Sequence, residues 1–383
     1  MDNSSEWTED SYNKIFQKYK SEDYFDEVEI VINYVKNLDA QPDGRVYKIQ
    51  SLQIGEYNEQ NDYFSELKNF IDLFNNILFG NSYPDDWQLF YVYKELFQFC
   101  IGKAKKGSCN YFRGQSHHYD LVPGILRGNV QNSYRKEFES LYLKIANEFP
   151  DKVSYFDFRS SDSIEQREYQ LSLLQHYGLK TSLLDITKNP YIAMLFMLSE
   201  QFNEYKEPTI YLFNIDEQVH RKKHLFTEVK KSKKNERIIA QQGAFLNFDK
   251  IFNNKSFDIE KITCIKIVLH FSEDYYTNYL DEEKENLSNI EKLDDSDSKA
   301  DYEQLLDREK HQIQNSKLNC LKFIKDELTR KLRNIIILKR IYFQILRSEY
   351  SIYQKNMSQM DKKRKSQADY ISVYFKKFKS EAI

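Results

Sequence analysis

The strongest constraint on the fold is a pair of short apolar runs in the middle of the chain, residues 209–214 and 263–271. Both combine aromatic and β-branched side chains, which is typical of strands. A helical pattern over residues 191–202 lies close by, because Asn189 supplies an N-cap and Pro190 stands at the first helical position. The middle of the chain therefore predicts an α+β fold and not an all-helical one.

The N-terminal part of the chain has patterns of both kinds. Residues 24–34 space their apolar side chains as one face of a helix, whereas residues 46–54 mix apolar and polar side chains as in a strand. Helical patterns follow at residues 63–78 and 87–100, with Gly and Pro between them as a break. We expect the first fifty residues to form an arm or a small cap, followed by one strand and two helices.

The end of the chain, residues 276–383, is strongly charged, with an excess of acids at 281–310 and of bases at 317–383. Apolar residues recur there at helical spacing, namely Leu321, Ile324, Leu328, Leu332 and Ile335. This pattern predicts a long amphipathic helix or a helix pair. We expect three regions in all: an N-terminal arm or cap (1–50), a central domain (51–275) and a charged helical C-terminal region.

The composition limits the class of protein. The chain has 56 Lys and Arg against 59 Asp and Glu, a formal net charge of −3, so whole-chain charge favours neither nucleic acid nor an anionic membrane as a partner. The 4 cysteines form no C-x-x-C pair, which indicates neither a disulfide framework nor a Cys-based zinc site. The chain starts with acidic and polar residues that do not form a secretion signal, and charges interrupt its most apolar stretch. We expect a soluble protein of the cytoplasm, not bound to a membrane.

The most distinctive stretch is residues 110–127, which begins NYFRGQSHHYD. Arg113 follows an aromatic run and precedes Gly114, which lets another backbone or a ligand approach closely. The five donors of a guanidinium suit a phosphate or a carboxylate. Two interpretations are open: Arg113 projects into a cleft and binds an anion, or it pairs with a buried carboxylate and holds the loop in place.

A second stretch, residues 171–190, leads into the helix that begins after Asn189. Gly178 is predicted to be the C-cap glycine of the preceding helix. His176 lies in the last turn of that helix, where the helix dipole favours a cation, so capping and a functional role are both open. Asp185 is the one carboxylate in this run, and we expect it to be the partner of Arg113.

These two stretches together resemble the FRG domain family, which is named for its Phe-Arg-Gly motif. The matching residues are Phe112-Arg113-Gly114-Gln115, Leu121, Pro123, Arg127, Gln175-His176-Tyr177-Gly178, Thr181, Leu183-Leu184-Asp185, Thr187, Asn189-Pro190 and Ala193, with a third group at Arg237, Gln241, Gly243 and Phe245. The resemblance spans about residues 51–271. The chain departs from the family where it has Lys180 for Pro, Ser182 for Arg and Ile186 for Trp.

The order of the three groups is also distantly similar to the Arg, Ser-Thr-Ser, Glu order of ADP-ribosyltransferases, whose split sheet holds NAD. This resemblance implies a split, mostly antiparallel sheet core with N-terminal helices and a C-terminal helical extension. It also implies NAD as substrate, a transferase activity, and a role as a bacterial toxin or in antiviral (anti-phage) defence. The catalytic residues would then be Arg113, Asp185 and Glu236. The residues expected to bind NAD are Arg113, Gly114, Gln115, His176, Tyr177, Thr181, Ser182 and Gln242.

The resemblance also implies a role for each group. Arg113 would hold phosphate or ribose oxygens, the hydroxyls of Thr181 and Ser182 would brace the nicotinamide side, and Asp185 would orient Arg113 or the ribose. Breaking the glycosidic bond builds positive charge on the ribose, and a nearby carboxylate stabilises that charge. Glu236 is the candidate for the late acid. Gln242, in the same group, either faces the ligand or lies at a strand edge.

Other interpretations remain open. His117 and His118 do not indicate a metal site, because adjacent side chains on an extended segment point to opposite faces. A basic run at residues 222–234 is either a solvated surface or a contact for an acidic partner or nucleic-acid phosphate. The rival hypothesis to an enzyme is a noncatalytic FRG module that binds nucleic acid or a protein. Its C-terminal helices would then serve as an interaction or homo-oligomerisation arm.

Overall fold

The computed structural model describes residues 11–37, 45–57, 63–80, 89–103, 108–158, 163–199, 206–228, 241–253, 259–273, 311 and 313–334. The chain divides into two units, residues 1–328 and 329–383. The elements described below belong to the first unit, except that the C-terminal helix continues beyond residue 328.

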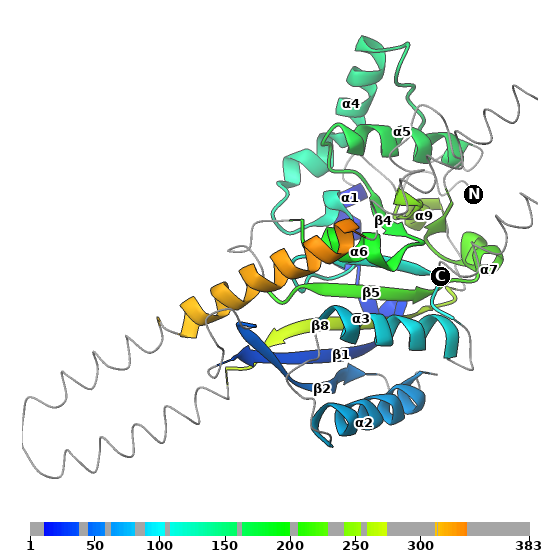
Figure 1. Ribbon diagram of the computed structural model, residues 1–383. Coiled ribbons are helices and arrows are strands. Elements are labelled where there is room, and N and C mark those ends of the chain that lie inside the picture. The colour runs from blue at the N-terminus through cyan, green and yellow to red at the C-terminus, as the bar shows by residue number, and fades with distance from the viewer. Residues whose placement is uncertain are drawn as a thin grey trace, which may run out of the picture. The chain divides into compact units, whose positions relative to one another are not determined.

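The described strands form one open sheet of eight strands in the order β2-β1-β8-β5-β3-β4-β7-β6 (Figure 1). Their bounds are β1 Phe25–Lys36, β2 Tyr47–Tyr57, β3 Tyr111–Gln115, β4 Leu183–Thr187, β5 Thr209–Asn214, β6 Phe226–Thr227, β7 Gly243–Asn247 and β8 Ile262–Phe271. β1 and β8 run parallel, and the other neighbouring strands run antiparallel. The expected α+β fold with a mostly antiparallel sheet is confirmed.

The helices of the first unit lie before, between and after these strands. They are α1 Ser11–Lys18, α2 Phe64–Gly80, α3 Leu89–Gln98, α4 Asn132–Glu148, α5 Ile164–His176, α6 Pro190–Met197, α7 Glu217–Lys223 and α9 Lys250–Asn253, with short turns at Ser21–Asp23, Phe99–Lys103 and Gly124–Leu126. The two expected helices after the first strand are α2 and α3, and the expected N-cap of α6 is present, because the Asn189 side chain accepts a hydrogen bond from the Tyr191 amide.

The prediction of a helix over residues 24–34 is wrong, because this segment is strand β1. β1 lies between β2 and β8 and pairs with β8 over ten positions, from Phe25↔Ile262 to Tyr34↔Phe271. Its buried Val28, Ile30, Ile32 and Tyr34 alternate with Glu29, Val31 and Asn33, so the segment has the period of two of a strand. The segment lies within the residues expected to form an arm or cap, and the structure makes it an inner strand of the sheet.

Each face of the sheet carries helices. On one face, α1, α4 and α5 join an apolar cluster that includes Tyr12, Phe138 and Leu171. On the other face, α3 and α6 lie across the strands (Figure 1), and Phe97 of α3 packs edge-on against Phe112 of β3. Successive residues of a strand point to opposite faces, so β3 contributes to both layers.

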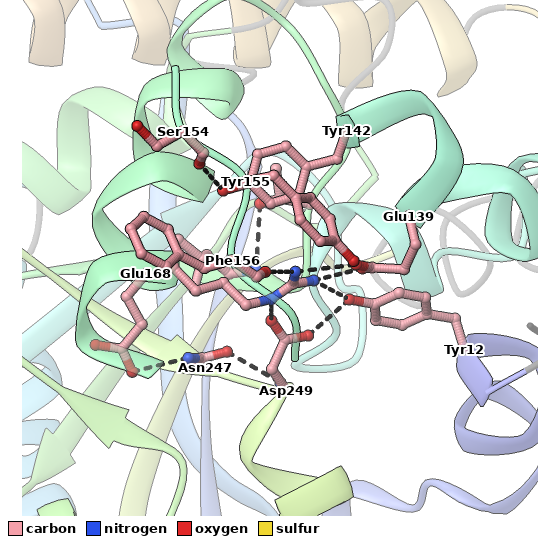
Figure 2. A network of polar contacts seen from close by, with 12 residues as sticks. Tyr12, Glu139, Tyr142, Ser154, Tyr155, Phe156, Glu168, Asn247 and Asp249 are labelled. Carbon is pink, nitrogen blue, oxygen red and sulfur yellow. Dashed lines mark hydrogen bonds and ion pairs between the residues drawn. The ribbon is translucent and has the colours of Figure 1, made fainter. Parts of the chain in front are cut away.

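A buried ion-pair network ties the first helical layer together around Arg167 of α5. Its Nε donates to Asp249 Oδ2 at 2.7 Å, and its Nη2 donates to Glu139 Oε1 of α4 at 2.5 Å. The Tyr12 hydroxyl of α1 also donates to Asp249, at 2.7 Å. Figure 2 shows Tyr12, Glu139 and Asp249 converging on one point from separate elements. Four parts of the chain are therefore held by one guanidinium.

The expected C-terminal helix is present over residues 313–334. Its first-unit part packs on the N-terminal strands, since Glu327 accepts a hydrogen bond from the Tyr47 hydroxyl at 2.9 Å and Phe323 contacts the Tyr47 ring. The remaining residues of the predicted helical region lie outside the described residues. In the described part of the chain, no helix is long and apolar enough to cross a membrane. All four cysteines are buried free thiols.

Candidate functional site

The two strands that carry the FRG-like motifs separate after a single contact. β3 and β4 share one register pair, Phe112↔Thr187, although each continues for further residues along its other neighbour. The next position of β3 is Arg113, and its Nη1 donates to the main-chain carbonyl of Asp185 at 2.7 Å. The Arg113 side chain thus bonds to β4 where main-chain hydrogen bonds would join two fully paired strands. We call this opening, lined by Arg113 and Asp185, the β3–β4 fork.

Arg113 is held in the fork without a counter-ion. Its Nε is buried and has no hydrogen-bond partner, and it makes no ion pair with a described residue. Burial lowers the pKa of Arg113 to about 10, against the opposing influence of Asp185. A guanidinium that is desolvated but unpaired is unfavourable, because a buried charge requires a partner. The carboxylate pairing expected with Asp185 is therefore replaced by a bond to its carbonyl oxygen.

Arg113 belongs to a row of side chains that crosses the sheet on one face. Arg113 is in register with Tyr211, Tyr211 with Lys266, and Lys266 with Glu29. At the far end of this row Lys266 and Glu29 form an ion pair at 2.9 Å. Charge is thus neutralised at one end of the row by a side-chain partner and left unneutralised at the other, at Arg113.

The neighbours of Arg113 in β3 have structural partners. A Cβ on Gly114 would lie 1.8 Å from the Ala193 carbonyl oxygen, so this glycine lets α6 approach the sheet. Gly114 and Arg113 are successive residues of β3, so Gly114 faces α6 and Arg113 lies on the opposite face of the sheet. The close contact of Gly114 is with the backbone of α6. The Gln115 amide donates to the Tyr119 carbonyl at 2.6 Å and is buried. Both residues were predicted to bind a cofactor, and both support the strand that presents Arg113.

The Asp185 carboxylate lies on the other side of the fork and is exposed. Its Oδ2 accepts a hydrogen bond from Gln175 Nε2 at 2.5 Å, and Gln175 Oε1 in turn accepts one from the Thr181 hydroxyl at 2.7 Å. The structure therefore brings Arg113, Asp185 and Thr181 to one place. Gln175 was missed as a site residue, although it stands first in the Gln-His-Tyr-Gly motif.

Two of the predicted hydroxyl ligands are enclosed. Ser182 is 0% exposed and Thr181 1% exposed. The Ser182 main-chain carbonyl accepts from the Phe248 amide at 3.0 Å, which fixes this turn to the end of β7. Thr181 thus acts on the fork through Gln175, and Ser182 lies in the layer beneath it.

His176 and Tyr177 lie at the end of α5, next to Gln175. Their rings contact each other at 5.4 Å between centroids, and Tyr177 is 70% exposed. Gly178 ends the helix with φ +94°, and its amide donates to the Gln175 carbonyl at 3.0 Å. The predicted C-cap is confirmed. It needs glycine, because this φ lies in the left-handed region.

The described residues include only the second half of the third motif group, from Gln241 onward. Glu236 and Arg237 lie outside the described residues. Gln242 is exposed with φ 50°, and its carbonyl accepts from the Lys188 amide at 3.1 Å. Gly243 then begins β7 opposite Thr187. Gln242 therefore lies at the end of a strand, three register positions away from Asp185.

Of the two adjacent histidines, His118 joins a polar cluster on the same side of the sheet as the Lys266–Glu29 pair, whereas the His117 ring stacks on Tyr119. His118 lies 3.5 Å from Glu29 and 3.3 Å from Glu207, and the His270 ring contacts Glu207 as well. Within the described ranges, no group of three or more His, Cys, Asp or Glu side chains is arranged to hold a metal ion. Two lysines of the basic run, Lys222 and Lys223, lie at the end of α7, and its later lysines lie outside the described residues.

Comparison with known proteins agrees with the motifs and adds no activity. Residues 108–206 match the family model described as the FRG domain. This segment includes β3, α5, β4 and α6, and so contains both sides of the fork. No curated protein and no solved structure matches the chain. The chain is thereby identified as a protein that contains an FRG domain.

Proposed function

We propose that the β3–β4 fork binds NAD or a related nucleotide and that the protein transfers ADP-ribose, as an effector in bacterial toxin or anti-phage systems. The observation that carries this proposal is the state of Arg113. It is a partly buried cation whose buried Nε has no hydrogen-bond partner and whose Nη1 makes a single bond to a neutral carbonyl. An anion that approached the fork would satisfy both its charge and its remaining donors.

A phosphate is the ligand group that fits this arrangement best. Guanidinium groups bind phosphates through paired donors, and such charge-assisted bonds are roughly twice as strong as neutral ones. The lowered pKa of Arg113, about 10, still leaves it charged at neutral pH. Part of the desolvation of Arg113, that of its Nε, has already occurred in the free protein, so an incoming anion gains more from the contact than it would at a fully solvated Arg.

The transfer chemistry rests on Asp185. Cleavage between nicotinamide and ribose develops positive charge on the sugar, and a carboxylate beside it stabilises that state. Asp185 is the exposed carboxylate of the fork and is fixed by Gln175. One preorganised group of this kind typically contributes about 3 to 4 kcal/mol to the barrier. Arg113 would hold the phosphate end while Asp185 faces the reacting end.

The test separates binding from chemistry. The full-length protein is incubated with a cell lysate and NAD labelled in the nicotinamide or in the adenylate, and NAD binding is measured separately by calorimetry. We expect wild type to release nicotinamide or label an acceptor. Arg113→Met should lose NAD binding, whereas Asp185→Asn should keep binding and lose turnover by about 100- to 1000-fold. Gln170→Ala, a change at a half-buried glutamine of α5 that bonds the Ser154 amide, serves as the control.

Failure of the proposal has a clear form. If wild type binds NAD but neither releases nicotinamide nor labels any component of the lysate, the transferase assignment is wrong and a nucleotide-binding module remains. If wild type does not bind NAD, the nucleotide assignment is wrong too. Salt-sensitive retention of DNA or RNA that is lost on deleting residues 317–383 would then favour the nucleic-acid-binding alternative.

A further inference from the structure

We infer that Gln175 is the positioning residue of the fork: it fixes the Asp185 carboxylate through a directed chain of hydrogen bonds that starts at Thr181. This inference rests on the proposed function for its catalytic meaning, but the chain of bonds is a property of the protein itself. Gln175 contacts Asp185 and no described residue of the opposite strand, so it acts through the carboxylate.

The contacts are short and come from three elements. Gln175 lies in the last turn of α5, Thr181 in the connection that follows, and Asp185 in β4. The Thr181 hydroxyl donates to Gln175 Oε1 at 2.7 Å, and Gln175 Nε2 donates to Asp185 Oδ2 at 2.5 Å. Thr181 is 1% exposed, so water does not compete for its hydroxyl.

The direction of the chain follows from what each group can do. The Thr181 oxygen also accepts from the Leu183 amide, at 3.3 Å, so its one proton is left for Gln175. A side-chain amide that accepts at its oxygen presents its NH₂ group on the other side. That group donates to Asp185 Oδ2 and thereby fixes the orientation of the carboxylate. Reversing the amide would place Oε1 against Oδ2 of Asp185 and lose that bond, so the contact with Asp185 fixes the direction of the chain.

The support under Gln175 is rigid. Leu171 and Leu174 of the same helix are 0% and 2% exposed and belong to the core cluster. The helix then ends at Gly178, whose amide donates to the Gln175 carbonyl. A group held on a packed helix end keeps its position better than one on a loop. This is the arrangement expected where a carboxylate must stay within a narrow range of orientations.

A tie between α5 and β4 that serves stability alone is the competing explanation, and kinetics distinguish the two. For Gln175→Ala we expect kcat for nicotinamide release to fall about 10- to 100-fold while the Kd for NAD stays within about threefold. Thr181→Val should give a smaller loss of the same kind, and Thr181→Ser, which keeps the hydroxyl, should retain wild-type kcat. Gln170→Ala changes an amide elsewhere on α5 that accepts from the Ser154 amide, so it controls for helix stability.

A second measurement does not depend on turnover. In protein labelled with ¹⁵N at glutamine, the Gln175 side-chain NH₂ should exchange slowly and shift on Asp185→Ala and on Thr181→Val, while the Gln170 signal stays in place. If these shifts occur but no NAD is turned over, the chain of bonds stands and the proposed function fails. Unchanged Gln175 signals in Asp185→Ala, or equal kcat in Gln175→Ala and wild type, would overturn the inference.

Discussion

Arg113 and Arg167 both carry buried guanidinium nitrogens, although Arg167 is 0% exposed and Arg113 only partly buried, and their surroundings are opposite. Arg167 is bonded to two carboxylates, Asp249 and Glu139, and to the Phe156 carbonyl. Arg113 has one bond, to the Asp185 carbonyl, and a buried Nε without a partner. Burial alone lowers the pKa of both groups, but the charges around Arg167 outweigh it and raise that pKa above its ordinary value.

This difference shows what distinguishes a structural arginine from a candidate ligand-binding one. Burial differs between the two, since Arg167 is fully buried and Arg113 only partly, but burial does not explain the difference in their pKa shifts. The set of partners does: Arg167 has its charge neutralised within the fold, and Arg113 does not. The folded state tolerates the cost at Arg113, which is the kind of local cost that is common at functional sites. The predictions below test whether this contrast is real.

The largest expected effect is the loss of Arg167. Arg167→Met would leave Asp249, whose side chain is 0% exposed, and Glu139 without their common cation. Removing one partner of a buried ion pair typically costs about 3 to 5 kcal/mol. We expect a fall of this size in the free energy of unfolding, measured with urea at pH 7.

Arg135 supplies the matched control for that experiment. It is as buried as Arg167, but its guanidinium donates to the Ile125 and Arg127 carbonyls and to the Asn132 amide oxygen. Arg135→Met therefore leaves only neutral acceptors and should cost less than Arg167→Met. Equal losses in the two variants would show that packing, and not charge, explains the role of Arg167.

The contrast between the two arginines also shows how far sequence reasoning reached. Turn and strand chemistry placed β5, β8, the start of α6 and the Gly178 cap, because these depend on neighbouring residues. β1 was misassigned because a short apolar run can be matched to helical spacing as well, although its buried Val28, Ile30, Ile32 and Tyr34 follow the period of two of a strand. The approach of Arg113 to Asp185 was expected from motif order. The Arg167–Asp249 pair, 82 residues apart, has no local signal.

Gln175 shows the same limit at the site itself. Its motif neighbours His176 and Tyr177 were selected as ligands because their side chains have recognisable chemistry, yet they lie on the exposed end of α5. The role of Gln175 depends on where α5 ends relative to β4. That distance is set by packing of the helix on the sheet, which the residue types alone do not specify.

An intermediate effect is expected for a third buried base, His224, which unlike arginine titrates in an accessible range. It is 0% exposed, its Nε2 lies 2.9 Å from the Tyr24 carbonyl, and burial lowers its pKa to about 3. The unfolded chain binds a proton there below about pH 6.5 and the folded protein does not, so stability falls as the pH falls through this window. His224→Gln should remove this contribution, which amounts to about 2 kcal/mol between pH 7 and pH 5.

The measurement is the difference in unfolding free energy between wild type and His224→Gln at the two pH values. Carboxylates also titrate in this range, but they are common to both proteins and cancel in the difference. His176→Gln, at an exposed position, is the control and should leave the pH dependence as in wild type. A difference that stays constant from pH 7 to pH 5 would mean that His224 binds its proton in the folded state. Burial without a counter-charge would then not lower the pKa of this base as it lowers that of Arg113.

The smallest effect on stability, and the most informative, is expected at Arg113. Arg113→Met removes a desolvated cation that has one bond to a neutral carbonyl, so the loss of that bond, about 1 kcal/mol, is offset by the relief of burying a charge. The free energy of unfolding should stay within about 1 kcal/mol of wild type, far from the loss in Arg167→Met. With NAD present at about 100 times its Kd, wild type should gain about 2.7 kcal/mol and Arg113→Met nothing. A loss in Arg113→Met as large as in Arg167→Met, without any effect of NAD on wild type, would make Arg113 a structural residue like Arg167.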